Sequence, residues 1–378
     1  MKAIKQWMPI LAFAAFLFVL TTAGILAEEK TYSAIEKREL QTRPEVTKEG
    51  LKDGSFQKTY ESYLSDQFPG RDQWVQLQTT VSRLFGKSEA NGVYFGADHY
   101  LLEKYTEEDF EEERLQMNMD ALASFVKMTA EKYPVHVMLV PTKTWVLKEK
   151  LPLFAPTYDE DVFYQRLEER LGVDAAQVLV PVERVLKEHA DEEIYYRTDH
   201  HWTTLGAWYG YEAYRQACKE TVSTDKKQEL RTIYEDFYGT TYAKVNQASQ
   251  ADEIAIYEPK RSLQVIYNMG EKTTDSLYEM EHLDTADQYR VFTGGNQAVL
   301  EISGGEKNGK TLLLIKDSFA NCMIPFLAED YEKMVVVDLR QLNVDCDVLV
   351  EMFQPTEIFV LYNSAQFAKD RDIAMKFN

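Results

Sequence analysis

The chain has 378 residues, of which 45% are hydrophobic and 12% aromatic, which is enough for a sizeable buried core and too much for a disordered protein. Its 42 basic and 62 acidic residues give a net charge of −20, which repels nucleic acid at long range, so no nucleic-acid partner is expected. Three cysteines allow at most one disulfide, and no Cys-X-X-Cys pair is present, so neither a disulfide framework nor a zinc ribbon is indicated.

An uncharged, apolar stretch runs from Trp7 to Ala27, with lysines before it and glutamates after it. As a helix it would be about 31 Å long, close to the thickness of a bilayer core. The basic N-terminal flank places the rest of the chain outside the cytoplasm. Because Ile25-Leu26-Ala27 is an acceptable cleavage site, residues 1–27 are either a signal peptide or a membrane anchor. The protein is therefore expected to be extracytoplasmic, either secreted or anchored in the cytoplasmic membrane.

The next part of the chain is charged and polar, and it predicts a tether or arm over residues 28–60. One large domain is expected over residues 61–378. Apolar residues at helical spacing predict a helix over 71–85. Apolar residues between glycines predict a hairpin or strand pair over 92–102.

From about residue 106, helical segments alternate with short apolar runs, which is typical of a mostly parallel sheet with helices on both faces. The sequence therefore predicts a three-layer α/β fold. Residues 222–305 break the alternation and predict an insertion of short strands and loops that forms one wall of a cleft. The predicted helices are 107–132, 164–171, 182–189 and 344–353, and the predicted strands are 135–140, 177–180, 312–315, 334–337 and 357–361.

A carboxylate, two imidazoles and an indole are adjacent in Asp199-His200-His201-Trp202. In an Asp-X-His arrangement the carboxylate can accept a hydrogen bond from one imidazole nitrogen and leave the other nitrogen free to take a proton. Apolar residues at helical spacing from Ala207 to Cys218 predict a helix that Thr203 caps. The two histidines are therefore expected in a strand-to-helix loop.

A second candidate group lies far downstream, where the apolar run from Thr311 ends in Ser318. This pattern is typical of a buried strand that delivers a hydroxyl to its carboxyl edge. Ser318 is either a nucleophile or a helix N-cap, and these roles are compatible at a strand-to-helix turn. Asp317 is expected to be structural, because adjacent side chains rarely point to the same place.

Six motifs occur together in a characteristic order along the chain. They are Asp66–Arg71, Gly92–Gly96, Val140–Lys143, Asp199–Trp202, Phe292–Asn296 and Lys316–Asn321. Together they resemble the DHHW family, relatives of the alginate O-acetyltransferase proteins in the SGNH hydrolase superfamily. The resemblance extends from about residue 36 to the C-terminus, and it implies an SGNH-like fold.

The resemblance implies a Ser-His-Asp triad in which Ser318 is the nucleophile, His201 the general base and Asp199 the carboxylate that orients it. Asn363 follows the last predicted strand, where SGNH enzymes place an oxyanion-hole asparagine. The usual Gly-X-Asn-Asp motif is absent there, so Asn363 is either an oxyanion donor or a turn residue. The backbone N–H of Ser318 or Phe319 is an alternative donor.

Other assignments for the same residues stay open. His200 could be the active imidazole in place of His201, or both rings could merely bond to the backbone. Asp199 and the two histidines could bind a metal, but adjacent histidines seldom converge on one ion, so no metal and no cofactor are expected. Trp202 is an accessory candidate for stacking on a sugar ring, or a core residue.

In this chain Asp199 and His201 precede Ser318, which matches the permuted motif order of the alginate acetylation proteins. The resemblance thus implies an extracytoplasmic O-acyl (acetyl) transferase or esterase that acts on a cell-envelope or exported polysaccharide. It also implies a membrane-bound O-acyltransferase as a partner. The alternative is a non-catalytic glycan-binding protein of the cell envelope with a degenerate site.

Overall fold

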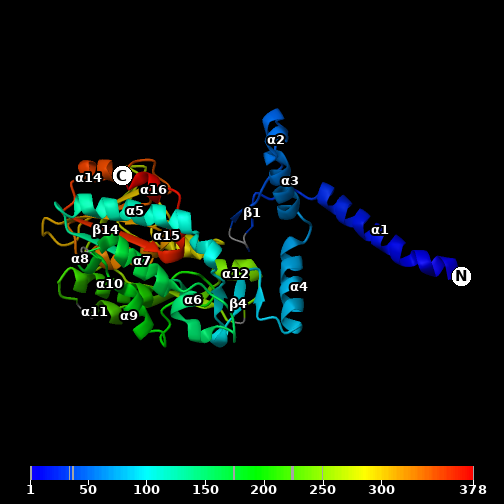
Figure 1. The fold of residues 1–378 in the computed structure, drawn as a ribbon, viewed down its shortest axis with the longest axis horizontal. Coiled ribbons are helices and arrows are strands. Elements are labelled where there is room, and N and C mark those ends of the chain that lie inside the picture. The colour runs from blue at the N-terminus through cyan, green and yellow to red at the C-terminus, as the bar shows by residue number, and fades with distance from the viewer. Residues whose placement is uncertain are drawn as a thin grey trace. The chain divides into compact units, whose positions relative to one another are not determined.

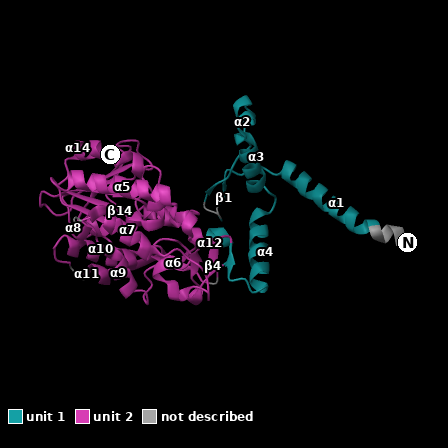
Figure 2. Cartoon of the chain, viewed as in Figure 1, with its two compact units in different colours: residues 1–90, 243–247 teal, residues 91–242, 248–378 magenta. Residues whose placement is uncertain are grey.

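The computed structural model describes residues 2–33, 35, 38–172, 175–222, 225–248 and 250–377 (Figure 1). The chain forms two compact units, which Figure 2 colours separately. The first unit comprises residues 1–90 and 243–247, and the second comprises residues 91–242 and 248–378. The sequence suggested a boundary at residue 60, but the helix predicted over 71–85 belongs to the first unit.

The first unit begins with a long apolar helix. Among the described residues, Trp7–Leu26 is the one helical stretch that is long and apolar enough to cross a membrane. The segment predicted as a tether contains helices as well as extended chain. Arg38 Nη2 lies 2.6 Å from Asp66 Oδ1, which joins the extended chain to the end of one of these helices. The elements are α1 (Lys2–Leu26), β1 (Tyr32–Ser33), β2 (Arg38–Glu39), α2 (Lys48–Asp53), α3 (Ser55–Asp66), α4 (Arg71–Leu84) and β3 (Glu89–Ala90).

The second unit is built on a seven-stranded sheet in the order β10-β9-β11-β13-β12-β14-β6. The strands β13, β12, β14 and β6 are parallel to one another. The strands β11, β9 and β10 extend the sheet in antiparallel fashion. The strands are β6 (Val135–Val140), β9 (Gln264–Tyr267), β10 (Lys272–Thr274), β11 (Val299–Ser303), β12 (Thr311–Lys316), β13 (Lys333–Val337) and β14 (Glu357–Asn363).

The parallel strands carry apolar side chains on both faces, so the sheet is covered on both sides. On β12, for example, Leu312 and Leu314 belong to one buried cluster, whereas Leu313 and Ile315 belong to another. The first cluster includes side chains of α9, α10 and α13, and the second includes side chains of α5, α7, α14 and α15. The mixed α/β architecture with three layers agrees with the sequence-based expectation.

The helices of the second unit agree with most of the predicted ones. The predicted strand 177–180 is wrong: residues 175–178 are helical, and Leu179 makes a single bridge to Val137. A short apolar run does not distinguish a strand from a buried helical turn. The α-helices are α5 (Glu112–Thr129), α6 (Lys143–Val146), α7 (Glu160–Leu171), α8 (Ala175–Val178), α9 (Val182–Glu188), α10 (Thr204–Ala217), α11 (Asp225–Gln228), α13 (Ile324–Leu327), α14 (Cys346–Phe353), α15 (Ser364–Lys369) and α16 (Ile373–Lys376).

Residues 222–305 contain short strands and loops, as the sequence indicated, but part of this region joins the main sheet. The strands β9, β10 and β11 form its antiparallel half, and β7 pairs with β8 as a separate hairpin. The helix α12 (Thr240–Val245) lies between the strands of that hairpin in sequence. The remaining elements are β4 (Val93–Phe95), β5 (Leu101–Glu103), β7 (Arg231–Phe237), β8 (Asp252–Ile256), and the 3₁₀ turns η1 (Ala97–His99), η2 (Glu107–Phe110), η3 (Lys148–Lys150), η5 (Met280–Asp284), η6 (Gln288–Val291) and η7 (Ser318–Cys322).

Candidate active site

Ser318 begins the turn η7 directly after the buried strand β12. Asp317 shapes this turn, because its carboxylate accepts hydrogen bonds from the N–H groups of Phe319, at 2.9 Å, and Asn363, at 2.8 Å. It therefore holds the serine turn against the end of the neighbouring strand β14, which agrees with the structural role expected for it. Ser318 is only partly buried, whereas Asp317 and Phe319 on either side of it are buried.

The loop that carries the histidines is closed by a bridge between Tyr195 and Trp202. Thr203 ends the loop and caps α10, as predicted, by accepting a hydrogen bond from Gly206 N–H at 3.2 Å. The indole of Trp202 donates to Phe319 O at 2.8 Å, so the loop is tied directly to the serine turn.

Asp199, His201 and Ser318 form one line of hydrogen bonds. His201 Nδ1 lies 2.6 Å from Asp199 Oδ1, and His201 Nε2 lies 2.8 Å from Ser318 Oγ. Asp199 and His201 are buried, with 1% and 4% of their surfaces exposed, so the pair is shielded from water. With Nδ1 directed at the carboxylate, Nε2 is the nitrogen that can take a proton from the serine.

The charges of this pair follow from burial and from the neighbouring rings. Burial and the nearby His200 lower the pKa of His201 to about 4, although Asp199 opposes this shift. Burial alone would raise the pKa of Asp199, but His201, His200 and hydrogen bonds hold this pKa well below its usual value. At neutral pH the imidazole is therefore uncharged and able to act as a base.

His200 lies beside this line rather than in it. Its Nδ1 is 2.6 Å from Thr240 Oγ1, and its ring centroid lies 3.8 Å from that of His201 with the planes tilted by 37°. Of the two histidines, the one whose nitrogen faces the serine hydroxyl is therefore His201.

Trp202 is fully buried, and its only ring N–H donates to Phe319 O. This placement favours a core role over stacking on a sugar ring. Through this hydrogen bond, Trp202 helps to position the serine turn.

The side-chain amide of Asn363 is hydrogen-bonded to backbone groups. Its side-chain NH₂ donates to Val140 O at 3.0 Å, and its Oδ1 accepts from Gln366 N–H at 3.3 Å, as the N-cap of α15. Both ends of the amide are thus bound to backbone groups at the carboxyl ends of β6 and β14. This agrees with the turn role kept open for Asn363.

A backbone donor is available in its place. The Phe319 N–H is already bound by Asp317, whereas the Ser318 N–H donates to no group among the described residues. This N–H belongs to the residue that carries the nucleophile, which is one of the oxyanion-hole donors in enzymes with a Ser-His-Asp triad.

Thr240 is a site residue that no sequence pattern indicated. Its N–H and its hydroxyl both donate to Asp199 Oδ2, at 2.7 and 2.9 Å. The preceding Gly239 lies so close that an added Cβ would be 2.1 Å from Asp199 Cβ. Loop 239–240 therefore packs directly on the carboxylate, and only glycine fits at its first position.

Lys143 holds the histidine loop through hydrogen bonds to its backbone. Its buried ammonium donates to the carbonyl oxygens of Tyr196, Arg197 and Asp199 at 3.0, 3.3 and 2.7 Å. Lys143 belongs to the motif 140–143 that contributed to the family resemblance, so a signal for this residue was present in the sequence.

Tyr289 covers the remaining face of His201. The two rings are stacked, with centroids 4.0 Å apart and planes within 9° of parallel. The tyrosine comes from η6 in the region 222–305, where no local pattern marked it. Together with Thr240, it shows that this region contributes directly to the site.

Asp199, His200 and His201 place one potential ligand atom each within 4.8 Å of one another. However, Nδ1 of His200 and Nδ1 of His201 are both engaged in short hydrogen bonds. The arrangement therefore matches an acid–base site more closely than a metal site.

Residues 174–337 match the family model described as DHHW protein. This range includes Asp199, His201 and Ser318 and ends before Asn363. The match confirms the resemblance inferred from the sequence motifs.

Among curated proteins, the chain is similar to the probable alginate O-acetylase AlgJ of Pseudomonas syringae pv. tomato, with 27% identity over 204 residues. The alignment covers 50% of this chain and 49% of the relative. A second match, to the protein of the same name in Pseudomonas putida, has 27% identity over 220 residues and covers 54% of this chain and 52% of the relative. The chain thus spans about half the length of the curated relatives it matches.

Among solved structures, a DHHW family protein from Eubacterium siraeum superimposes with a TM-score of 0.63 and 22% identity, covering 77% of this chain and 96% of the other. Bacillus cereus PatB1, solved with a sulfonyl adduct, superimposes with a TM-score of 0.58 and 20% identity, covering 75% of this chain and 97% of the other. At these identities the likeness concerns the fold.

Proposed function

Proceeding from the DHHW family match, we propose that this chain is an extracytoplasmic O-acyltransferase or esterase. The acyl group is acetyl, and the substrate is a polysaccharide. The observation that carries the proposal is the hydrogen-bonded line from Asp199 through His201 to Ser318. The names of the curated relatives, probable alginate O-acetylases, support an acetyl group and a polysaccharide.

In the proposed reaction, Ser318 Oγ attacks the carbonyl carbon of an acyl donor while its proton passes to His201 Nε2. Asp199 stabilises the imidazolium that forms and keeps Nδ1 protonated. The tetrahedral intermediate collapses, and the imidazolium gives its proton to the departing oxygen. An acyl-Ser318 ester remains on the enzyme.

The negative charge on the oxygen of the intermediate needs a donor in the same turn. We assign the Ser318 N–H to this role, because no group among the described residues accepts its hydrogen bond. One oxyanion donor is typically worth about 3 kcal/mol of transition-state stabilisation.

The second half of the reaction decides between transfer and hydrolysis. A sugar hydroxyl or a water molecule loses its proton to His201 and attacks the acyl-serine, which gives either an acetylated glycan or free acetate. The same residues serve both outcomes. The acceptor that reaches Ser318 is therefore the only difference between transferase and esterase.

We also propose that the order Asp199, His201, Ser318 reflects a permuted SGNH-type arrangement. In the same proposal, α1 is a membrane anchor or a signal segment, and a membrane-bound O-acyltransferase supplies the acyl group. The single candidate membrane span among the described residues, Trp7–Leu26, is compatible with anchoring.

A fluorophosphonate probe tests the proposal, because it reacts with serines that a neighbouring base activates. We expect covalent labelling at Ser318, identified by peptide mass spectrometry, and no labelling in Ser318→Ala. The wild-type protein is then incubated with an acetyl ester and an oligosaccharide acceptor. Acetylated glycan as the product would indicate a transferase, and free acetate would indicate an esterase.

Ser364→Ala is a matched control, since Ser364 is a buried serine that also begins a helix but donates to Glu160 rather than facing a histidine. This variant should keep the labelling. Absence of labelling in correctly folded wild-type protein would contradict the proposal and favour the alternative of a non-catalytic glycan-binding protein.

A further inference from the structure

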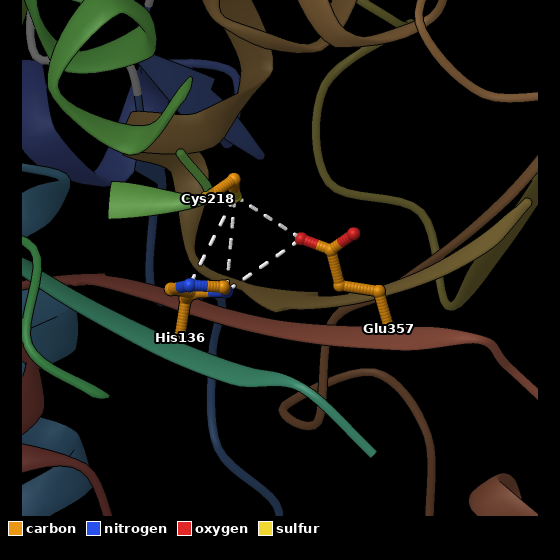
Figure 3. Close-up of side chains that lie close together, drawn as sticks. All are labelled: His136, Cys218 and Glu357. Atoms are coloured by element: carbon orange, nitrogen blue, oxygen red, sulfur yellow. Dashed lines mark hydrogen bonds and ion pairs between the residues drawn. The ribbon is translucent and has the colours of Figure 1, made fainter. Parts of the chain in front are cut away.

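A second cluster of reactive side chains lies in the same unit, at the amino ends of the parallel strands. It consists of His136 on β6, Glu357 at the start of β14, and Cys218 at the end of α10 (Figure 3). Ser318, by contrast, follows the carboxyl end of β12, and Asn363 is the last residue of β14. The cluster therefore lies at the opposite ends of the parallel strands from Ser318 and takes no part in the proposed reaction.

The three side chains converge on one point, as Figure 3 shows. Cys218 Sγ lies 3.3 Å from Glu357 Oε1 and 3.9 Å from each ring nitrogen of His136, and His136 Nδ1 lies 3.5 Å from Glu357 Oε1. In a tetrahedral zinc site with ordinary bond lengths, neighbouring ligand atoms are roughly 3.3–3.6 Å apart. The distances in the cluster thus differ from those of a zinc site by only a few tenths of an ångström.

The ring of His136 would have to turn about its Cβ–Cγ bond to complete the site, because both nitrogens are now equally far from the sulfur. Nδ1, which is near Glu357, is the nitrogen we assign as the ligand. Such a turn changes only the final torsion of the side chain and leaves β6 in place.

The carboxylate of Glu357 is also held by a hydrogen bond from a residue outside the proposed ligand set. Tyr214 donates to Glu357 Oε1 at 2.6 Å, and the hydroxyls of Tyr214 and Tyr331 are 2.7 Å apart. Hydrogen bonds of this kind, made by groups outside the ligand set, fix the orientation of metal ligands in known sites. Tyr214 thus holds the carboxylate in place in the absence of an ion.

The donor atoms of the cluster also suit a cation. The carboxylate of Glu357 accepts hydrogen bonds from Tyr214 and from the Cys218 thiol. A divalent cation would bind Cys218 as the thiolate and so release the thiol proton.

Access to the cluster exists from one side. His136 and Cys218 line a pocket of about 1230 Å³ whose other walls come from α7, α8, α9 and α10 and from Ala130, Tyr133 and Pro134 between α5 and β6. An ion held by three protein ligands would keep its fourth position toward this pocket, where a water molecule can bind.

We infer that His136, Cys218 and Glu357 form a binding site for a divalent transition-metal ion, with Zn²⁺ the best match. Thiolate and imidazole ligands select zinc over magnesium and calcium, which prefer oxygen. The ion would join the end of α10 to β6 and β14. Because α10 begins at the histidine loop, the metal would stabilise the helix that supports the triad without entering the reaction.

Cobalt(II) is a suitable probe, because a cysteine thiolate that binds it gives a near-ultraviolet charge-transfer band. Chelator-treated full-length protein should bind one equivalent of Co²⁺ and show this band, and Zn²⁺ should abolish it by displacement. Cys218→Ser should lose the band and bind at least about tenfold more weakly. A hundredfold excess of Zn²⁺ over the wild-type Kd should raise the Tm of the wild type by roughly 5 °C and that of Cys218→Ser by at most about half as much.

Two controls separate this site from others. Cys346→Ala removes a buried free thiol outside the cluster and should keep the band. His201→Ala alters the second group of potential metal ligands found among the described residues and should also keep the band. Absence of the band in the wild type, its survival in Cys218→Ser, or its loss in His201→Ala would overturn the inference.

Discussion

His201 Nε2 lies 2.8 Å from Ser318 Oγ, although the two residues are 117 positions apart in the chain. Two separate hydrogen bonds hold the two residues in this contact. Asp317 fixes the serine turn to the end of β14, and Trp202 links the histidine loop to Phe319 in the same turn. The contact therefore depends on the packing of the whole sheet edge rather than on either loop alone.

The first prediction concerns the roles of the two histidines. His201→Ala should lose at least about 10²-fold in kcat/KM toward an acetyl ester, because it removes the group that accepts the serine proton. Ser318→Ala should lose about as much, and the double variant no more, since residues that act as a unit are non-additive. His200→Ala should keep far more activity. The reverse ranking of the two histidine variants would contradict the assignment of His201 as base.

The second prediction concerns pH. Only the neutral form of His201 can accept a proton, and burial with the nearby His200 lowers its pKa to about 4. The acidic limb of kcat/KM should therefore have its midpoint near pH 4, well below the usual pKa of an imidazole. In His200→Gln the neighbouring charge is absent, so the midpoint should move to higher pH.

A matched test of this prediction returns each sample to pH 7 after exposure to acid, and recovery of full activity shows that the limb reports titration rather than unfolding. A wild-type midpoint near pH 6.5 would show that burial does not control the pKa of this histidine, and a midpoint that does not move in His200→Gln would show that the charge of His200 does not contribute to its shift.

The third prediction concerns the hydroxyl of Thr240. Thr240→Val removes its hydrogen bonds to Asp199 Oδ2 and to His200 Nδ1 but keeps the backbone N–H bond to Asp199 Oδ2. We expect kcat/KM to fall roughly 10- to 100-fold, because the carboxylate loses part of its orientation. Thr240→Ser keeps the hydroxyl and should stay close to the wild type. Equal losses in both variants would mean that the methyl group, rather than the hydrogen bond, matters.

Much of this arrangement follows from local patterns in the sequence. The apolar runs around β6, β12, β13 and β14 indicated a parallel sheet, and an apolar run ending in Ser318 indicated a hydroxyl at its carboxyl edge. Thr203 marked the start of α10. Such features depend on residues close together in sequence, which is why they could be predicted.

The missed features depend on distant residues. Thr240 reaches Asp199 across 41 positions, and nothing in its own neighbourhood indicates this. The antiparallel half of the sheet was read as an insertion alone, because short strands in a region rich in turns give a weak signal. The partners of Asn363, similarly, are set by how β6 and β14 meet.

The fourth prediction concerns Lys143 and stability. Lys143→Met should remove three hydrogen bonds to buried carbonyl oxygens of the histidine loop and destabilise the fold by about 3 kcal/mol. Lys148→Met is the matched control, because Lys148 is exposed; its effect should stay within about 0.5 kcal/mol. Unfolding in urea measures both. Equal stability of the two variants would show that the loop holds its shape without the ammonium.

The last prediction concerns a buried carboxyl group near the same edge of the sheet. Glu160 accepts hydrogen bonds from the hydroxyls of Thr142 and Ser364, and burial raises its pKa to about 7 despite these bonds. Because its folded-state pKa lies above its unfolded value, the folded state binds more protons between about pH 4.5 and pH 7. The stability contributed by the protonated group is thus fully present below about pH 4.5 and is lost as pH rises through about 7, at a cost of about 3 kcal/mol.

Glu160→Gln replaces the titrating group with a neutral one of the same shape, so it should remove this loss. We expect the free energy of unfolding to fall less between pH 5 and pH 8 in the variant than in the wild type. Glu149→Gln, at an exposed glutamate, should leave the wild-type dependence unchanged. Urea titrations of the three proteins at both pH values give the comparison. If Glu160→Gln shows the same fall as the wild type, then Glu160 is ionised throughout this range, and its hydrogen bonds from Thr142 and Ser364 outweigh the effect of burial.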